Sequence, residues 1–135
     1  MSSDTGYLVD TNVLLWAMFD KEKLSQTAQK ALLDDKVPAY YSPVSLWEIS
    51  IKYAIGKLNL LGMKPDDFLR RMDKSFFLCK NVDIDAAATL YQLPLYHRDP
   101  FDRLLIQEAI SAGLTLLSAD KSMQAYVAEG LRLIN

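Results

Sequence analysis

Short apolar runs alternate along the chain with longer segments in which apolar residues recur at helical spacing. The short runs predict strands, and they are Tyr7–Val9, Ala39–Tyr41, Phe76–Cys79, Leu114–Ser118 and Leu131–Ile134. The longer segments predict helices over about Val13–Phe19, from Ser25, over Ser42–Ile55, from Lys64, and over Asp83–Leu90, Asp99–Ala112 and Lys121–Ala128. Strands that alternate with helices form crossover units, so the pattern predicts an α/β fold with a mostly parallel central sheet covered on both faces.

Several of the predicted helices carry recognisable end signals. Ser42 can cap the helix that follows it, and Pro43 suits the first helical position. Gly56 and Gly113 follow the last periodic residues of two helices, where glycine commonly ends a helix. These signals support the predicted order of elements.

The length and composition of the chain predict one domain. It has 135 residues, 50% of them hydrophobic, and no internal repeat, low-complexity tract or linker. A chain of this size can bury its own core, so we expect a single domain over residues 1–135. With one cysteine, Cys79, and one histidine, His97, it can form neither an internal disulfide nor a zinc site of Cys and His ligands.

The sequence gives no sign of export or of membrane insertion. Residues Met1–Gly6 lack the basic and apolar regions of a signal peptide. The longest apolar run, Val13–Phe19, is too short to span a bilayer. We therefore expect a cytoplasmic protein without membrane association.

The net charge limits the ways in which this chain could bind a nucleic acid. It is −2, whereas nucleic-acid-binding domains are often basic overall. Such binding would depend on a local rim of basic side chains.

Carboxylates stand where a parallel sheet gathers its ligands, beyond the carboxyl ends of the strands. Asp10 follows the first predicted strand, and Asp120 follows the strand Leu114–Ser118. Asp99 and Asp102 open the helix before that strand. Each of these acids could instead serve only to cap a helix, and taken singly that interpretation has at least equal weight.

Glu48 is harder to explain by local structure. At helical spacing it shares a face with the apolar residues Val44, Ile51 and Ile55. An ionised carboxylate is unfavourable on a buried apolar face unless it is compensated. The alternative is a glutamate at the margin of that face, paired with Lys52.

If these carboxylates converge, their mutual repulsion raises their pKa values and destabilises the fold, and a bound divalent cation would remove that repulsion. Oxygen ligands without a cluster of Cys or His favour a hard ion, Mg²⁺ or Mn²⁺. Such ions activate water and stabilise the leaving oxygen of a phosphodiester. The pattern therefore indicates phosphoryl chemistry.

Four segments of the chain resemble, in order, the motifs of the PIN-domain family. They are Tyr7–Leu14 with its Asp-Thr-Asn, Ser42–Lys52 with its Glu48, His97–Ile106 with its Asp102, and Leu116–Asp120. The third segment is similar to that of one branch of VapC toxins, the nuclease halves of VapBC toxin–antitoxin pairs. One departure is Gln107-Glu108, where this branch leads us to expect Ala-Gln.

The resemblance implies an α/β/α sandwich that cleaves RNA with Mg²⁺ or Mn²⁺. It implies a catalytic quartet, with Asp10 and Asp102 as direct metal ligands, Asp120 helping to ligate or orient, and Glu48 orienting or deprotonating the attacking water. The polar neighbours that could fix these carboxylates by hydrogen bonds are Thr11, Asn12, Ser118 and, as a cap or supporting group, Asp99.

Basic residues flank the motifs and could contact RNA phosphates. The substrate-binding candidates are Lys52, Arg98 and Arg103, and Lys57, His97 and Lys121 could extend the rim. Trp16, Tyr40, Tyr41 and Trp47 could stack on bases, but their apolar neighbours favour packing in the core. The helix Val44–Ile55 is expected to be buried in the monomer.

The implied partners are an RNA substrate, a cognate antitoxin and, as an option that the sequence allows, a second copy of the chain.

Alternatives with the same fold are a stand-alone PIN nuclease in RNA processing and a non-catalytic PIN-like binding module. A receiver domain would need an acidic pair after the first strand and an acid after Phe76–Cys79, and the chain has neither. A nucleotide-binding enzyme would need a glycine-rich phosphate loop, which is absent from the sequence.

Overall fold

Five parallel strands form one sheet in the computed structural model, which describes residues 6–135. The strands are β1 (Tyr7–Val9), β2 (Ala39–Tyr41), β3 (Leu78–Cys79), β4 (Thr115–Leu117) and β5 (Arg132–Ile134), in the spatial order β3-β2-β1-β4-β5. The five predicted strands and their parallel direction are confirmed, although β3 is shorter than predicted. The prediction that no signal peptide is present concerns residues 1–5, which lie outside the described residues.

The helices also follow the predicted order. They are α1 (Thr11–Phe19), η2 (Lys21–Lys23), α2 (Gln26–Leu33), α3 (Pro43–Ala54), α4 (Pro65–Asp73), α5 (Ile84–Ala88), η3 (Leu90–Gln92), α6 (Pro100–Ala112) and η4 (Lys121–Glu129). Two predictions differ in detail, because the predicted helix Asp83–Leu90 is divided into α5 and η3, and η4 is a 3₁₀ helix. Within the described residues, no helix has the length and apolarity needed to cross a membrane.

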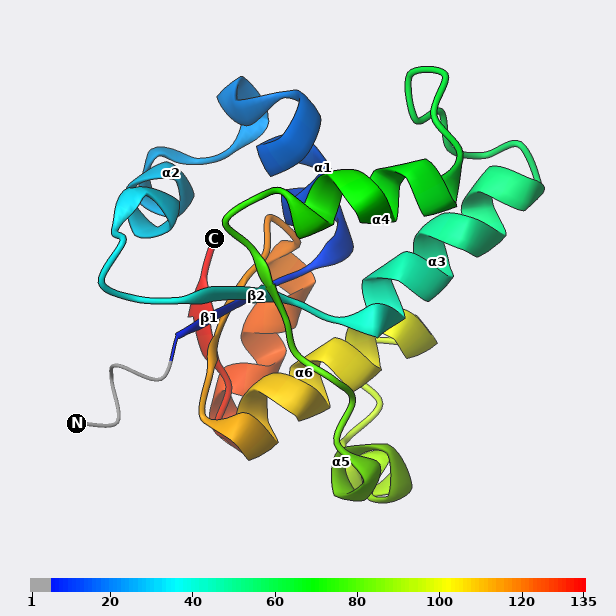
Figure 1. Ribbon diagram of the computed structural model, residues 1–135. Coiled ribbons are helices and arrows are strands. Elements are labelled where there is room, and N and C mark those ends of the chain that lie inside the picture. Colours follow the sequence, from blue (N-terminus) through cyan, green and yellow to red (C-terminus); the bar gives the residue numbers. More distant parts are fainter. Residues whose placement is uncertain (1–5) are drawn as a thin grey trace.

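The sheet lies between two helical layers, and the two faces bury separate apolar clusters (Figure 1). On one face, residues of α1, α2 and α4 pack with Val9 and Leu117 of the sheet. On the other, residues of α6 and η4 pack with Leu8 and Leu116. The alternation of neighbouring strand residues between the two clusters shows that both faces are covered, which confirms the α/β sandwich.

Helix α3 departs from the expected burial. Val44 and Ile49 are buried, but Trp47 and Ile55 are 59% and 60% exposed. The helix extends past the sheet in Figure 1, so Ile55 at its end has little of the core to pack against. Trp47 lies earlier in the helix, next to the buried Glu48 and Ile49, and is therefore exposed because it is on the outward face of the helix. The predictions that Trp47 packs in the core and that this helix is buried in the monomer are therefore wrong.

The strand order fixes where a ligand site can form. From β1 the chain crosses to β2 and β3 on one side, and it later returns to β4 on the other side of β1. In parallel sheets, the crevice beyond the carboxyl ends of two such strands is the usual ligand site, because their following loops diverge there. Asp10 follows β1 at this point, and its backbone N–H donates to the Leu117 carbonyl of β4 at 3.0 Å.

Glu108, in α6, is a buried acid outside the group of carboxylates that the sequence singles out. Its side chain has no exposed surface, and it accepts a hydrogen bond from the Ser42 hydroxyl at 2.9 Å, which links α6 to the start of α3. Its Oε1 atom is buried and has no hydrogen-bond partner within the described chain. Burial raises the pKa of Glu108 to about 7, although the hydrogen bond from Ser42 opposes the rise.

We predict that Glu108→Gln stabilises the protein increasingly as the pH rises. The unfolded carboxyl group ionises near its ordinary value of 4.5, and the folded one near 7, so the wild type loses folding free energy between these values. The substitution removes that loss, which is about 3 kcal/mol at most. Thermal unfolding from pH 4.5 to 8 should show a growing difference, and the exposed control Glu22→Gln should show none. Equal destabilisation by Glu108→Gln at every pH would contradict this account.

Candidate active site

Four carboxylates from separate elements meet beyond the carboxyl ends of β1 and β4. Asp10 follows β1, Asp120 precedes η4, Glu48 lies in α3 and Asp102 lies in the first turn of α6. Their convergence is visible in their electrostatics, because the charges of Glu48 and Asp120 act on Asp10, and those of Asp10 and Glu48 act on Asp102. The acids that the sequence singles out are thus within electrostatic reach of one another.

Asp10 and Asp120 are helix caps as well as members of this cluster. The Oδ1 atom of Asp10 accepts a hydrogen bond from the N–H of Val13 at 2.8 Å. The Oδ1 atom of Asp120 accepts from the N–H and the hydroxyl of Ser122, at 2.9 and 2.7 Å. Capping therefore uses Oδ1 of each carboxylate, and it fixes the direction in which Oδ2 points.

Asp10 is the most deeply buried aspartate of the cluster, with 4% of its surface exposed. Burial raises the pKa of Asp10 to about 6, and the negative charges of Glu48 and Asp120 add to the rise. Hydrogen bonds from the Ser118 side chain and the Val13 amide oppose it. Ser118 also accepts from the Asp120 N–H at 3.0 Å, so one serine joins the two strand ends.

Asp102 has the largest rise in pKa among the three aspartates of the cluster, with burial as its main cause. Burial raises the pKa of Asp102 to about 7, and the charges of Asp99, Asp10 and Glu48 act in the same direction, whereas His97 opposes them. Asp120 differs, because the hydrogen bond from the Ser122 hydroxyl, assisted by one from His97, holds the pKa of Asp120 below its usual range.

Glu48 is buried in α3 and is held at both oxygens. The Thr11 hydroxyl donates to Oε1 at 2.7 Å, and the Lys52 ammonium group contacts Oε2 at 2.5 Å. The hydrogen bond to Glu48 raises the pKa of Lys52. Lys52 keeps 45% of its side chain exposed, so it compensates the buried carboxylate from the protein surface.

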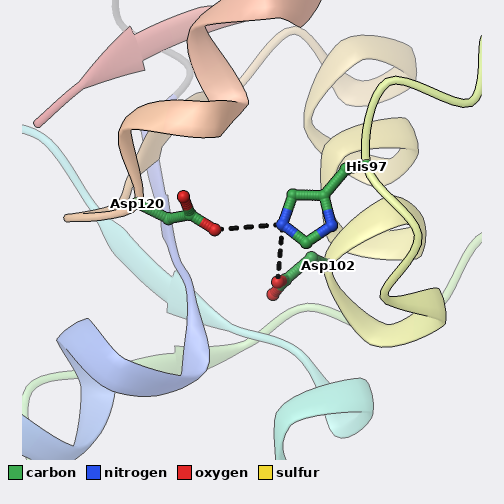
Figure 2. Close-up of side chains that lie close together, drawn as sticks. All are labelled: His97, Asp102 and Asp120. Carbon is green, nitrogen blue, oxygen red and sulfur yellow. Dashed lines mark hydrogen bonds and ion pairs between the residues drawn. The ribbon is translucent and has the colours of Figure 1, made fainter.

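His97 belongs to the cluster, although the sequence analysis considered it only as part of a basic rim. Figure 2 shows its ring between the two acids, with Nε2 lying 3.0 Å from Oδ2 of Asp120 and 3.3 Å from Oδ2 of Asp102. The signal that could have found it is its place five residues before Asp102, where a turn before a helix brings the side chain back towards the first helical turn.

The remaining polar candidates divide between caps and surface groups. Asp99 caps α6, because its carboxylate accepts from the N–H groups of Phe101 and Asp102 at 2.8 and 3.3 Å. Asn12 is exposed, and its side chain makes no hydrogen bond to the described part of the chain. Arg98 follows His97 directly in the chain and is exposed, as a phosphate contact would require.

Arg103 does not lie where a substrate-binding residue should lie. It is 8% exposed, and its guanidinium donates to the carbonyls of Pro94, Leu93 and Leu90 at 2.9, 3.1 and 3.3 Å. The prediction that Arg103 contacts phosphates is therefore wrong, because its donors are directed into the protein. Its contacts instead hold the segment 90–94 against α6.

The cluster suits a hard divalent cation. Oxygen atoms of Asp102 and Asp120 lie, together with a nitrogen of His97, within 4.8 Å of one another, and Asp10 lies close enough to repel both acids. Burial and like charges raise the pKa values of Asp10 and Asp102, and a cation bound beside these carboxylates would remove the repulsion. Asp10, Asp102 and Asp120 are the residues that would hold it.

Comparisons with known proteins agree with this architecture. A family model described as "PIN domain" matches residues 7–129. Among solved structures, VapBC2 from Rickettsia felis bound to a promoter DNA fragment has a chain with a TM-score of 0.68 and 17% identity, covering 96% of this chain and 97% of that one.

Two further solved structures are similar to the same extent. FitAcB from Neisseria gonorrhoeae gives a TM-score of 0.65 at 22% identity, covering 96% of both chains. DNA-bound VapBC from Salmonella typhimurium gives 0.64 at 19% identity, covering 96% of this chain and 97% of that one. The comparison with curated proteins gave no match.

We predict that Asp102→Asn stabilises the metal-free protein. The unfolded carboxyl group ionises near 3.8 and the folded one near 7, so the wild type loses stability as the pH rises between these values. In EDTA at pH 8 the variant should gain about 4 kcal/mol at most, less the smaller loss of an acid at a helix start. At pH 4 the gain should vanish.

The matched control is Asp85→Asn, which removes an exposed acid from the first turn of α5. Thermal unfolding of both variants should show the pH-dependent gain for Asp102→Asn alone. A lower melting temperature for Asp102→Asn at pH 8 would mean that Asp102 serves the helix start and is not under repulsion.

Proposed function

The chain belongs to the PIN-domain family, and on that premise we propose that it is a metal-dependent endoribonuclease and the toxin of a VapBC-like toxin–antitoxin pair. PIN domains are generally nucleases, that is, hydrolases of phosphodiester bonds. The observation that carries the proposal is the convergence of Asp10, Glu48, Asp102 and Asp120 at the point where the loops after β1 and β4 diverge. Capping accounts for Asp10 and Asp120 singly, but it does not account for the meeting of all four acids, which a bound cation would stabilise.

The surroundings of the acids support a division of roles among them. Asp10 and Asp102 would hold Mg²⁺ or Mn²⁺, and Asp120 would help through Oδ2, because Ser122 already bonds its Oδ1. A cation held there would neutralise charge on the phosphate and favour ionisation of a water molecule. Thr11, Ser118 and Asp99 keep the carboxylates or their helix in place.

Glu48 orients the attacking water and takes its proton. Thr11 and Lys52 fix the two oxygens of this carboxylate and leave further lone pairs free. The water oxygen bonds to phosphorus, the bond from phosphorus to the leaving ribose oxygen breaks, and a proton from solvent completes that hydroxyl group. Lys52 then stands beside the reacting phosphate, where its charge offsets that of the phosphate.

The basic rim that RNA binding needs is smaller than the sequence indicates. Lys52 and Arg98 remain as phosphate contacts, and Lys57 and Lys121 are exposed residues that could extend the path. With a net charge of −2, the affinity for RNA should depend on these few side chains, and therefore on salt.

The proposed partners are an antitoxin and a second copy of the chain. Three of the similar structures are named as VapBC or as a toxin–antitoxin complex, which supports an antitoxin for this chain. Both kinds of assembly need apolar surface, and α3 exposes Trp47, Ile51 and Ile55 along one side. We place this pair in the cytoplasm, where its RNA would be.

We predict that Asp10→Asn abolishes cleavage of labelled RNA and leaves the fold intact. Asparagine still accepts the capping hydrogen bond from Val13, but it removes the charge that binds the cation, so the rate should fall at least about 100-fold. The assay uses purified protein free of antitoxin, with Mg²⁺ or Mn²⁺ and with EDTA. Asp85→Asn, an exposed control, should cut at the wild-type rate, and equal cutting by Asp10→Asn would show that the site lies elsewhere.

A further inference from the structure

His97 occupies a central place in the carboxylate cluster that the family motif roles do not account for. It is the one histidine of the chain, and its Nε2 atom lies within hydrogen-bonding distance of both Asp120 and Asp102 (Figure 2). Only 15% of its side chain is exposed. A nitrogen so close to two carboxylates would ordinarily be taken for a third metal ligand.

The other ring nitrogen decides which role Nε2 can play. The backbone N–H of Asp99 points at Nδ1 of His97, at 3.1 Å. A backbone N–H can only donate, so Nδ1 must accept and carries no hydrogen. In a neutral ring the hydrogen is then on Nε2, which makes Nε2 a donor towards Asp120 and Asp102 and leaves it without a lone pair for a metal ion.

The ring is held in this position by the rest of the segment. The backbone N–H of His97 donates to the Tyr126 hydroxyl at 2.8 Å, and that hydroxyl donates to the Pro94 carbonyl at 2.7 Å. The buried Arg103 donates to the same carbonyl, and also lies 3.4 Å from the Tyr126 hydroxyl. Hydrogen bonds at its backbone N–H and at Nδ1 thus hold His97 in the position that places Nε2 beside the two acids.

We propose that His97 is a positioning residue that holds Asp102 and Asp120 together through its Nε2 hydrogen, and that it is not a ligand of the cation. This proposal rests on the proposed function, because a metal-dependent ribonuclease requires the cation that Asp102 and Asp120 would bind. Ligation by Nε2 would require the hydrogen to move to Nδ1, where it would face the N–H of Asp99. In the absence of the ion, the same Nε2 hydrogen offsets part of the repulsion between the two carboxylates.

The first test is the protonation pattern of the ring, observed by long-range ¹H–¹⁵N NMR on protein labelled with ¹⁵N-histidine. A chain with one histidine gives one set of ring signals. We expect a protonated Nε2 and an unprotonated Nδ1 at pH 8, both in EDTA and with saturating Mg²⁺. A ring that carries its hydrogen on Nδ1, in either condition, would overturn the proposal.

The second test uses a matched pair of substitutions. His97→Asn places an acceptor near the position of Nδ1 but does not reach the acids, whereas His97→Gln places an amide donor near the position of Nε2. Loss of a group that orients a metal ligand weakens metal binding by about 10- to 100-fold. Calorimetry should show a loss of Mg²⁺ affinity in that range for His97→Asn and a recovery of most of it for His97→Gln. The melting temperature in EDTA should follow the same order.

The outcomes separate this proposal from the proposed function. If wild-type protein binds neither Mg²⁺ nor Mn²⁺, the proposed function is wrong, while the ring pattern and the EDTA melting temperatures still decide whether His97 holds the acids. If the wild type binds Mg²⁺ and both variants bind it equally well, the positioning role of His97 is wrong. If the two variants lose affinity equally and melt alike in EDTA, donation by Nε2 is not what matters, and the proposal also falls.

Discussion

Repulsion among carboxylates gathered beyond β1 and β4 is the constraint on which the rest of the structure depends. Buried negative charges are unfavourable when they lie together, yet the strand order brings Asp10 and Asp120 to the same crevice, and α3 and α6 add Glu48 and Asp102. The consequences are visible as raised pKa values for Asp10 and Asp102, about 6 and 7. A cation is the simplest agent that relieves all of these interactions together.

The protein offsets part of this repulsion with neutral donors. Backbone and hydroxyl groups of Val13, Ser122 and Thr11 each donate to one of the acids. These bonds serve local structure as well, because two of them cap helices. Capping and the proposed catalytic role are therefore compatible for Asp10 and Asp120, since each carboxylate caps with Oδ1 alone, and Oδ2 of Asp120 lies towards His97.

The sequence allowed the sheet, its helices and the four acids to be predicted, because strand ends and helix faces follow from local patterns. Glu48 was predictable as a charge on an apolar face, and Asp99 as a helix cap. The burial of Arg103 was not predictable, because it depends on Tyr126 and the segment 90–94, which contact Arg103 only in the folded chain. For His97 the sequence offers a signal in its place five residues before Asp102, but its contact with Asp120 forms only in the folded chain. Likewise, exposure of Trp47 depends on which face of α3 is covered by α1, α4 and α6 in the folded chain, which no local pattern reveals.

The measurement that tests the central claim most directly is the location of Mn²⁺ by anomalous scattering in crystals of the protein soaked in the ion. The account predicts one dominant peak within bonding distance of carboxylate oxygens of Asp10 and Asp102, with Asp120 beside it and Glu48 one water molecule away. Mn²⁺ bound only elsewhere, with the four carboxylates free of metal at millimolar concentrations, would contradict the claim that this cluster exists to hold a catalytic cation.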